Sequence, residues 1–171
     1  MTGLRRSTTD KQANTAATAE SAKEGLVISR LIDAPRERVF QAWTDPAELV
    51  HWWGPHGFST PLCELDVRPG GEFRLHMRSP EGEVYPIRGR YHEVVCPELL
   101  VYSDDWEEGF RPSQDSHVQV QFTEQADKTL LTVRSLFASV EEREAMEQQG
   151  LIEGWLEGLE RLESHLAKGR S

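Results

Sequence analysis

The chain has 171 residues, with 19 basic and 29 acidic side chains and a net charge of −10 at pH 7. This acidic balance disfavours nucleic acids and anionic membrane surfaces as partners, because both attract cationic faces. The sequence also lacks the roughly 20 consecutive apolar residues that a membrane-spanning helix needs. We therefore expect a cytoplasmic protein with one domain and a tail, which binds neither nucleic acid nor membranes.

The N-terminal segment differs from the rest of the chain in composition. Its run from Ser7 to Ala19 contains no bulky apolar side chain. Such a segment cannot bury enough surface to offset the entropy cost of ordering its backbone. We predict a disordered tail over residues 1–24 and a single folded domain over residues 25–168.

Strand and helix patterns open the folded part. The segment Leu26–Ile32 alternates in the manner of a strand. The run Asp33-Ala34-Pro35 then predicts the start of a helix with proline in its first turn. Asp45-Pro46-Ala47-Glu48 is a capping-box pattern and predicts a second short helix that ends at about Trp53.

Residues 57–137 change to a period of two, which is typical of strands. Six such runs are separated by turn signals, and their short connections predict antiparallel pairing. Because neighbours on a strand face opposite sides, Asp104 and Asp105 do not form a carboxylate pair, and we interpret them as part of a solvated acidic rim. The inward-facing side chains predicted by the alternation are Met77, Tyr85, Tyr91, Val118, Val120, Phe122 and Val133.

The last predicted element is the longest. Ser139 and Glu142 form a second capping box, and an apolar stripe predicts one helix from there to about Ala167. Glycine inside a helix costs about 1 kcal/mol relative to alanine. Three glycines at four-residue spacing therefore predict a close neighbour or open space along one edge of the helix: Gly150, Gly154 and Gly158.

These elements together predict an α+β helix-grip fold. A curved antiparallel seven-stranded sheet wraps around the long C-terminal helix, and two short helices follow the first strand. A curved sheet cannot touch a straight helix along its whole length. We expect a gap at one end, covered by the two short helices, and such gaps are preferred ligand sites.

Several segments resemble AHSA1-like proteins, which are relatives of the C-terminal domain of the activator of Hsp90 ATPase. These proteins belong to the START/Bet v 1-like, or SRPBCC, superfamily of helix-grip folds. The resemblance covers about residues 25–166. Its segments are Arg30–Pro46, Trp52-Trp53-Gly54-Pro55, Arg68–Arg74, Gly82, Gly89–Val94 and Gly154-Trp155 with Leu159 and Leu162. The resemblance implies a deep, largely apolar cavity between sheet and helix, but no catalytic set.

Aromatic and apolar side chains around the expected gap are the candidate ligand-binding residues. We expect one of Trp52 and Trp53 in the core and the other at the cavity, and Trp106 at the rim. Tyr85 and Tyr91 are candidates to orient a ligand carbonyl, because a buried hydroxyl needs a partner. The full set is Trp52, Trp53, Met77, Tyr85, Tyr91, Trp106, Val118, Val120, Phe122, Leu151 and Trp155.

The predicted function is binding of a hydrophobic or amphipathic small molecule, lipid-like or polycyclic aromatic, in the internal cavity. One alternative is a cyclase or dehydratase that uses Tyr85, Tyr91 or a histidine for proton transfer. Another is a regulator of an Hsp90-type chaperone. A chaperone partner is disfavoured, because residues 1–24 are too short for the extra domain of such activators.

The remaining expectations concern metals, cofactors and assembly. The six histidines lack metal-ligand spacing, so we expect no metal site, and nothing in the sequence indicates another cofactor. Cys63 and Cys96 are expected to be free thiols. A homodimer is left open.

Overall fold

The computed structural model describes residues 18–21, 25–109 and 116–168. In these ranges the strands form one antiparallel sheet in the spatial order β1-β2-β8-β7-β6-β5-β4-β3. The strands are β1 (Thr18–Ser21), β2 (Gly25–Ile32), β3 (Ser59–Leu65), β4 (Glu72–Arg78), β5 (Val84–Val95), β6 (Leu99–Trp106), β7 (His117–Gln125) and β8 (Lys128–Leu136). Strands β2 to β8 are the seven predicted from the sequence.

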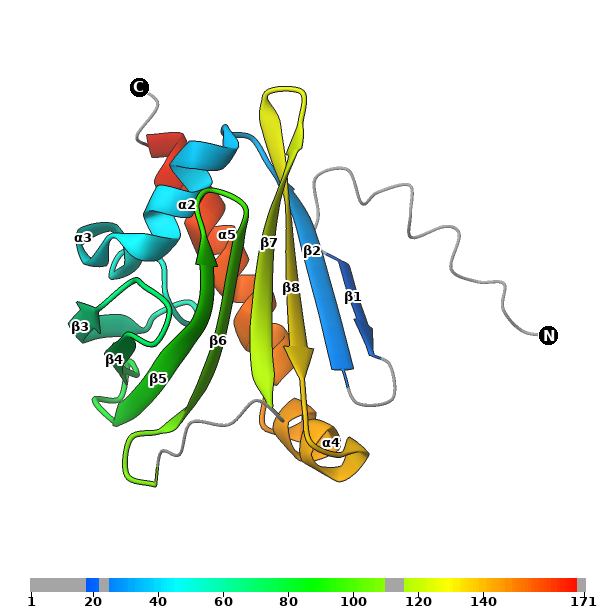
Figure 1. The fold of residues 1–171 in the computed structure, drawn as a ribbon. Coiled ribbons are helices and arrows are strands. Elements are labelled where there is room, and N and C mark those ends of the chain that lie inside the picture. Colours follow the sequence, from blue (N-terminus) through cyan, green and yellow to red (C-terminus); the bar gives the residue numbers. More distant parts are fainter. Residues whose placement is uncertain (1–17, 22–24, 110–115, 169–171) are drawn as a thin grey trace.

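The helices lie on one side of this sheet. They are α2 (Arg36–Thr44), α3 (Pro46–Leu49), α4 (Val140–Gln148) and α5 (Leu151–Lys168). Figure 1 shows the sheet bending around α5, with α2 and α3 near its C-terminal end and α4 at its other end. The predicted helix-grip fold is confirmed. No helix in the described ranges is long and apolar enough to cross a membrane.

Strand β1 corrects part of the prediction that residues 1–24 are a disordered tail. Thr18–Ser21 pairs antiparallel with β2, from Thr18 opposite Ser29 to Ser21 opposite Leu26. An edge strand needs only backbone hydrogen bonds to its neighbour, so it forms without the bulky apolar side chains that this segment lacks. The rest of the predicted tail lies outside the described residues.

The single C-terminal helix predicted from Ser139 to Ala167 is two helices. Gly150 has φ +95° and separates α4 from α5. This left-handed conformation is favourable for glycine and ends a helix. None of the side chains of α4 is fully buried. The sequence pattern is continuous across Gly150 because it records apolar spacing and not backbone handedness.

Helix α3 is also shorter than predicted, since it ends at Leu49 and not near Trp53. Asp45 caps it as expected, and its carboxylate accepts from the backbone N–H of Ala47 at 3.0 Å. Residues 50–52 then form turns, in which the backbone N–H of His51 donates to the carbonyl of Glu48 at 3.0 Å and that of Trp53 donates to Leu49 at 3.1 Å.

The core lies between the sheet and the helices α2 and α5. Phe40 and Trp43 of α2 meet the ring of Phe122 on β7 at centroid distances of 5.1 and 6.1 Å, both edge to face. Val120 and Val133 are buried beside them, as the alternation predicted. The inner face of the sheet is thus well filled in the middle, and its two ends differ.

Candidate functional site

An apolar cavity lies between the inner face of β3–β6 and the segment that carries α2 and α3. Its lining residues are Trp43, Leu49, Trp53, Leu65, Phe73, Leu75, Tyr91, Leu100 and Tyr102. The cavity has a free volume of about 20 Å³, which is room for about one water molecule. The deep cavity implied by the family resemblance is therefore mostly occupied by side chains at this place.

The alternation in β4 and β5 creates the floor of the cavity. Phe73 and Leu75 point inward from β4, and Phe73 pairs with Gly89 of β5. A Cβ atom at Gly89 would lie 2.0 Å from Cζ of Phe73, so only glycine lets this ring lie across β5. The ring then packs against Tyr91 and Tyr102 at centroid distances of 5.2 and 5.4 Å.

Four tryptophans pack together beside the cavity, and two of them, Trp43 and Trp53, line it. Trp43 is central, with Trp52 at 4.9 Å, Trp53 at 6.0 Å and a stacked Trp155 at 6.1 Å. The indole N–H of Trp52 donates to the carbonyl of Ala42 at 3.0 Å. The buried indole N–H of Trp43 has no hydrogen-bond partner among the described residues. Trp52 belongs to the core, whereas Trp53 lines the cavity.

Arg161 of α5 fixes the loop that carries Trp53. Its Nη1 donates to the carbonyls of Trp53 and Gly54 at 3.0 Å and of Pro55 at 2.9 Å. Its Nη2 reaches the carbonyl of His51 at 3.3 Å. Burial lowers the pKa of this guanidinium. The sequence placed Arg161 on the polar face of the helix, and no local pattern indicated this role.

Two buried tyrosines are the hydroxyl-bearing side chains of the lining. Burial raises the pKa of Tyr91 and that of Tyr102 above the usual range. Both hydroxyls are therefore protonated at neutral pH and can donate a hydrogen bond. Tyr91 is a predicted site residue, whereas Tyr102 is not, although it alternates with outward-facing neighbours in the same way.

At the end of the inner face away from the cavity, aromatic side chains are accessible to solvent. Tyr85 lies 6.1 Å from the ring of Phe58 and 6.1 Å from that of Trp106. Trp106 is 48% exposed and does not line the cavity. The hydroxyl of Tyr85 donates to the carboxylate of Glu83 at 2.7 Å, and this bond raises the pKa of the tyrosine.

Asp104 shares this open end. It pairs with Gly89, and Asp105 pairs with Arg88, so the two carboxylates face opposite sides of the sheet as predicted. Asp104 is reached by solvent. The protein atoms around it still displace part of its hydration. This desolvation, with a smaller contribution from the charge of Asp105, raises the pKa of Asp104 to about 6.

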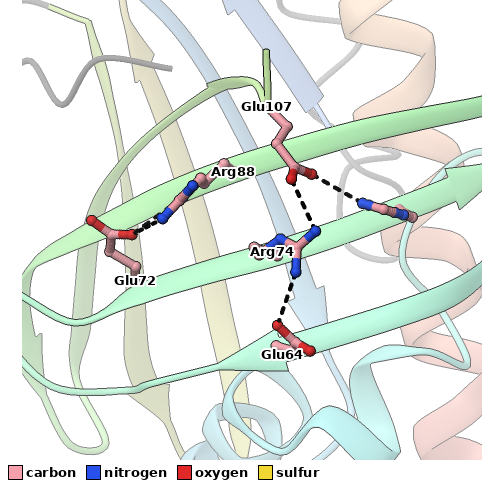
Figure 2. A network of polar contacts seen from close by, with 6 residues as sticks. Glu64, Glu72, Arg74, Arg88 and Glu107 are labelled. Atoms are coloured by element: carbon pink, nitrogen blue, oxygen red, sulfur yellow. Dashed lines mark hydrogen bonds and ion pairs between the residues drawn. The ribbon is translucent and has the colours of Figure 1, made fainter. Parts of the chain in front are cut away.

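The outer face of β3–β5 carries a network of opposite charges (Figure 2). Arg74 donates to Glu107 at 2.9 Å and to Glu64 at 3.4 Å. Arg88 donates to Glu72 at 2.8 Å. These arginines are thus directed away from the inner face and are bonded to outer-face carboxylates.

The network also lowers the pKa values of its carboxyls. Hydrogen bonds from Arg90 and then Arg88 lower the pKa of Glu72. Hydrogen bonds from His76 and Arg74 lower that of Glu107. No three His, Cys, Asp or Glu side chains in the described ranges converge in a way that could hold a metal ion.

The structure divides the predicted site residues into three groups. Trp53 and Tyr91 line the cavity. Trp52, Val120 and Phe122 are buried core residues that do not line it. The remaining candidates are half-buried or exposed and do not line it either: Met77, Tyr85, Trp106, Val118, Leu151 and Trp155.

The lining residues missed by the sequence analysis are Leu49, Leu65, Phe73, Leu75, Leu100 and Tyr102, besides Trp43. Phe73 and Leu75 share the alternation of Met77, so the pattern could have found them. Leu49 and Leu65 could not be found in this way. Their place at the cavity depends on how α3 and the edge strand β3 pack.

The fold and the enclosed apolar space place the chain in the helix-grip class. Its sequence then specifies the family. Residues 33–167 match the family described as activator of Hsp90 ATPase homolog 1-like protein, or AHSA1, and the chain belongs to this family.

Solved structures have the same fold. A protein from Nitrosomonas europaea is 27% identical with a TM-score of 0.80, and the match covers 88% of this chain and 99% of that one. A protein from Mycobacterium smegmatis is 28% identical with a TM-score of 0.80, and the match covers 91% of this chain and 98% of that one. The AHSA1 protein from Silicibacter pomeroyi is 25% identical with a TM-score of 0.67, and the match covers 85% of this chain and 99% of that one. A search of curated proteins returned no match.

Proposed function

We propose that this protein binds a small, largely apolar molecule in the cavity between the inner face of β3–β6 and the segment that carries α2 and α3. The observation that carries the proposal is the apolar cavity, which side chains from α2, α3, the following loop and four strands enclose. Folds of this family commonly have a ligand-binding cavity in this space. A cytoplasmic location stays a prediction.

The cavity must widen to admit a ligand. Pockets for drug-sized molecules have volumes of about 300–1,000 Å³. Trp53 and Leu65 are the half-buried members of the lining. Arg161 holds Trp53 by its backbone carbonyl, so movement of the indole does not require the loop to move. That movement breaks the ring contacts of Trp53 with Trp43 and Trp155. Displacement of the Trp53 and Leu65 side chains opens the cavity to the surface without breaking the sheet.

The indole N–H of Trp43 supports a ligand with one hydrogen-bond acceptor. A buried donor without a partner costs about 1–3 kcal/mol. A carbonyl or ether oxygen on the ligand would remove that cost at Trp43, which lines the cavity. The apolar body of the ligand would gain about 25 cal/mol for each Å² of apolar surface that it buries.

The test is uptake of 1-N-phenylnaphthylamine, a neutral apolar fluorophore. The wild-type protein should bind it in a saturable manner. Leu65→Trp should weaken binding at least about tenfold, because the larger side chain fills the cavity from the edge strand. Val95→Trp is the matched control, since Val95 is exposed on β5 and does not line the cavity.

Three results would contradict the proposal. The first is absence of saturable uptake by the folded wild-type protein. The second is equal uptake by the Leu65→Trp variant when its urea unfolding shows that it is folded. Equal loss in both variants would also count against the cavity as the binding site.

The alternative functions stay predictions. A cyclase or dehydratase needs a general base as well as an acid. The raised pKa values of Tyr91 and Tyr102 suit them to donate protons or hydrogen bonds and not to act as bases at neutral pH. Regulation of a chaperone ATPase is tested by co-purification with the host chaperone.

A further inference from the structure

The open end of the inner face combines aromatic rings with an ionisable carboxyl. Asp104 and Trp106 are two residues apart on β6 and therefore lie on the same face, about 7 Å from each other along the strand. Tyr85 on the neighbouring strand places its ring 6.1 Å from that of Trp106. Its hydroxyl is bonded to Glu83, which brings a second carboxylate to the rings.

The charges of this region are distributed by face. Arg74 and Arg88 lie on the outer face, where they donate to Glu107 and Glu72. The charged group that acts on Asp104 is Asp105, a like charge. No ion pair joins Asp104 to a cation among the described residues. Among the described residues, the inner face is therefore anionic at this end, and Arg74 and Arg88 lie on the other side of the sheet.

We propose that Asp104, Trp106 and Tyr85 recognise a small organic cation, an amine or quaternary ammonium with an apolar body. Aromatic faces attract such cations through the ring quadrupole, and more strongly than they attract the neutral hydrocarbon. The Asp104 carboxylate supplies the opposite charge. The inference rests on the proposed function, because the apolar body of the ligand would extend from this end towards the cavity.

A closely matched ligand pair tests this selectivity. Benzyltrimethylammonium and neopentylbenzene have the same shape and differ in one atom, a charged nitrogen in place of carbon. Binding is measured by two-dimensional NMR titration at about pH 7.5, where a carboxyl with a pKa of about 6 is ionised. We expect the cation to bind about tenfold more tightly than the hydrocarbon. The signals that move should include the indole N–H of Trp106.

Two variants assign the preference to the inner-face carboxylate. Asp104→Asn should remove most of the preference for the cation while the affinity for neopentylbenzene stays the same. Asp105→Asn removes the same charge from the adjacent residue, but on the outer face. It should keep most of the preference, because its carboxylate does not face the rings.

The outcomes separate this inference from the proposed function. Equal affinities for the two ligands, or an equal effect of the two asparagine variants, would overturn the inference alone. Failure of both ligands to bind a protein that still takes up 1-N-phenylnaphthylamine would also overturn it alone. If the fluorophore does not bind either, the proposed function fails with it.

Discussion

The two ends of the inner face are formed by the same strands, but their aromatic side chains are buried to different extents. At the closed end, Phe73, Tyr91 and Tyr102 are buried and pack ring against ring. At the open end, Tyr85 is half-buried and Trp106 is exposed. The closed end contributes to stability through burial, whereas the open end keeps aromatic surface available to a ligand.

Gly89 marks the boundary between these ends. The ring of Phe73 lies over it on one side, and Asp104 pairs with it on the other. From Tyr91 to Tyr85 is six residues, or about 20 Å along a strand. A change from apolar core to anionic aromatic surface thus takes place along one strand, which suits a ligand with an apolar end and a charged end.

The largest expected loss of unfolding free energy comes from a substitution at the closed end. Phe73→Ala removes a buried ring that contacts both tyrosines, and such substitutions cost about 3–5 kcal/mol of unfolding free energy. Trp106→Ala at the open end should cost less, about 1–2 kcal/mol, because the indole is 48% exposed. Urea unfolding measures both. Similar costs for the two variants would show that the ends do not differ in this way.

The next effect concerns the loop that covers the closed end. Arg161→Ala leaves the carbonyls of His51, Trp53, Gly54 and Pro55 without their donor. We expect a loss of about 2 kcal/mol in urea unfolding and a shift of the Trp53 indole signal in NMR spectra. Arg161→Lys should recover only part of this loss, because an ammonium lacks the planar fork of a guanidinium. An unchanged unfolding midpoint in the alanine variant would refute this role.

The smallest expected change in unfolding free energy is at the open end, and it is a gain in stability. The pKa of Asp104 is about 6 in the folded state against 3.8 for the ordinary carboxyl, so the folded protein binds more protons between these values. Its contribution favours folding most below about pH 4 and is lost as the pH rises through 6. Asp104→Asn should therefore stabilise the protein at about pH 7.5.

The size of this gain is limited by solvent. Because Asp104 is exposed, we expect less than about 1 kcal/mol at about pH 7.5 and almost no gain at about pH 4. Urea unfolding of the variant and the wild type at the two pH values measures the difference. A gain of equal size at both would mean that the charge of Asp104 is not responsible for it.

Much of the fold could be predicted because its signals are local. The alternation in β4 and β5 identified the inner face, and the patterns around Pro35 and Pro46 identified two short helices. The break at Gly150 was missed, because glycine at a helical spacing is compatible with a continuous helix and with a left-handed turn. The strand at Thr18–Ser21 was missed because its pairing needs no apolar pattern.

The candidate site could be predicted only in part. The sequence indicated that Trp53 or Trp52 reaches the cavity, but packing against Trp43 decided which one. It also indicated the side on which Tyr91 lies, but not how fully neighbouring rings fill the space. Volume depends on the distance between sheet and helix, and that distance is a property of the packed molecule.

The sequence by itself determined the order of the elements, the inner face of the sheet and the family. These follow from spacing along the chain, which fixes the direction of each side chain on a strand or helix. Only the tertiary structure decided that Arg161 holds a loop 108 positions away at Trp53, and that Asp104 shares a face with Tyr85. Such contacts depend on strand register and helix packing, which bring distant residues together and have no local pattern.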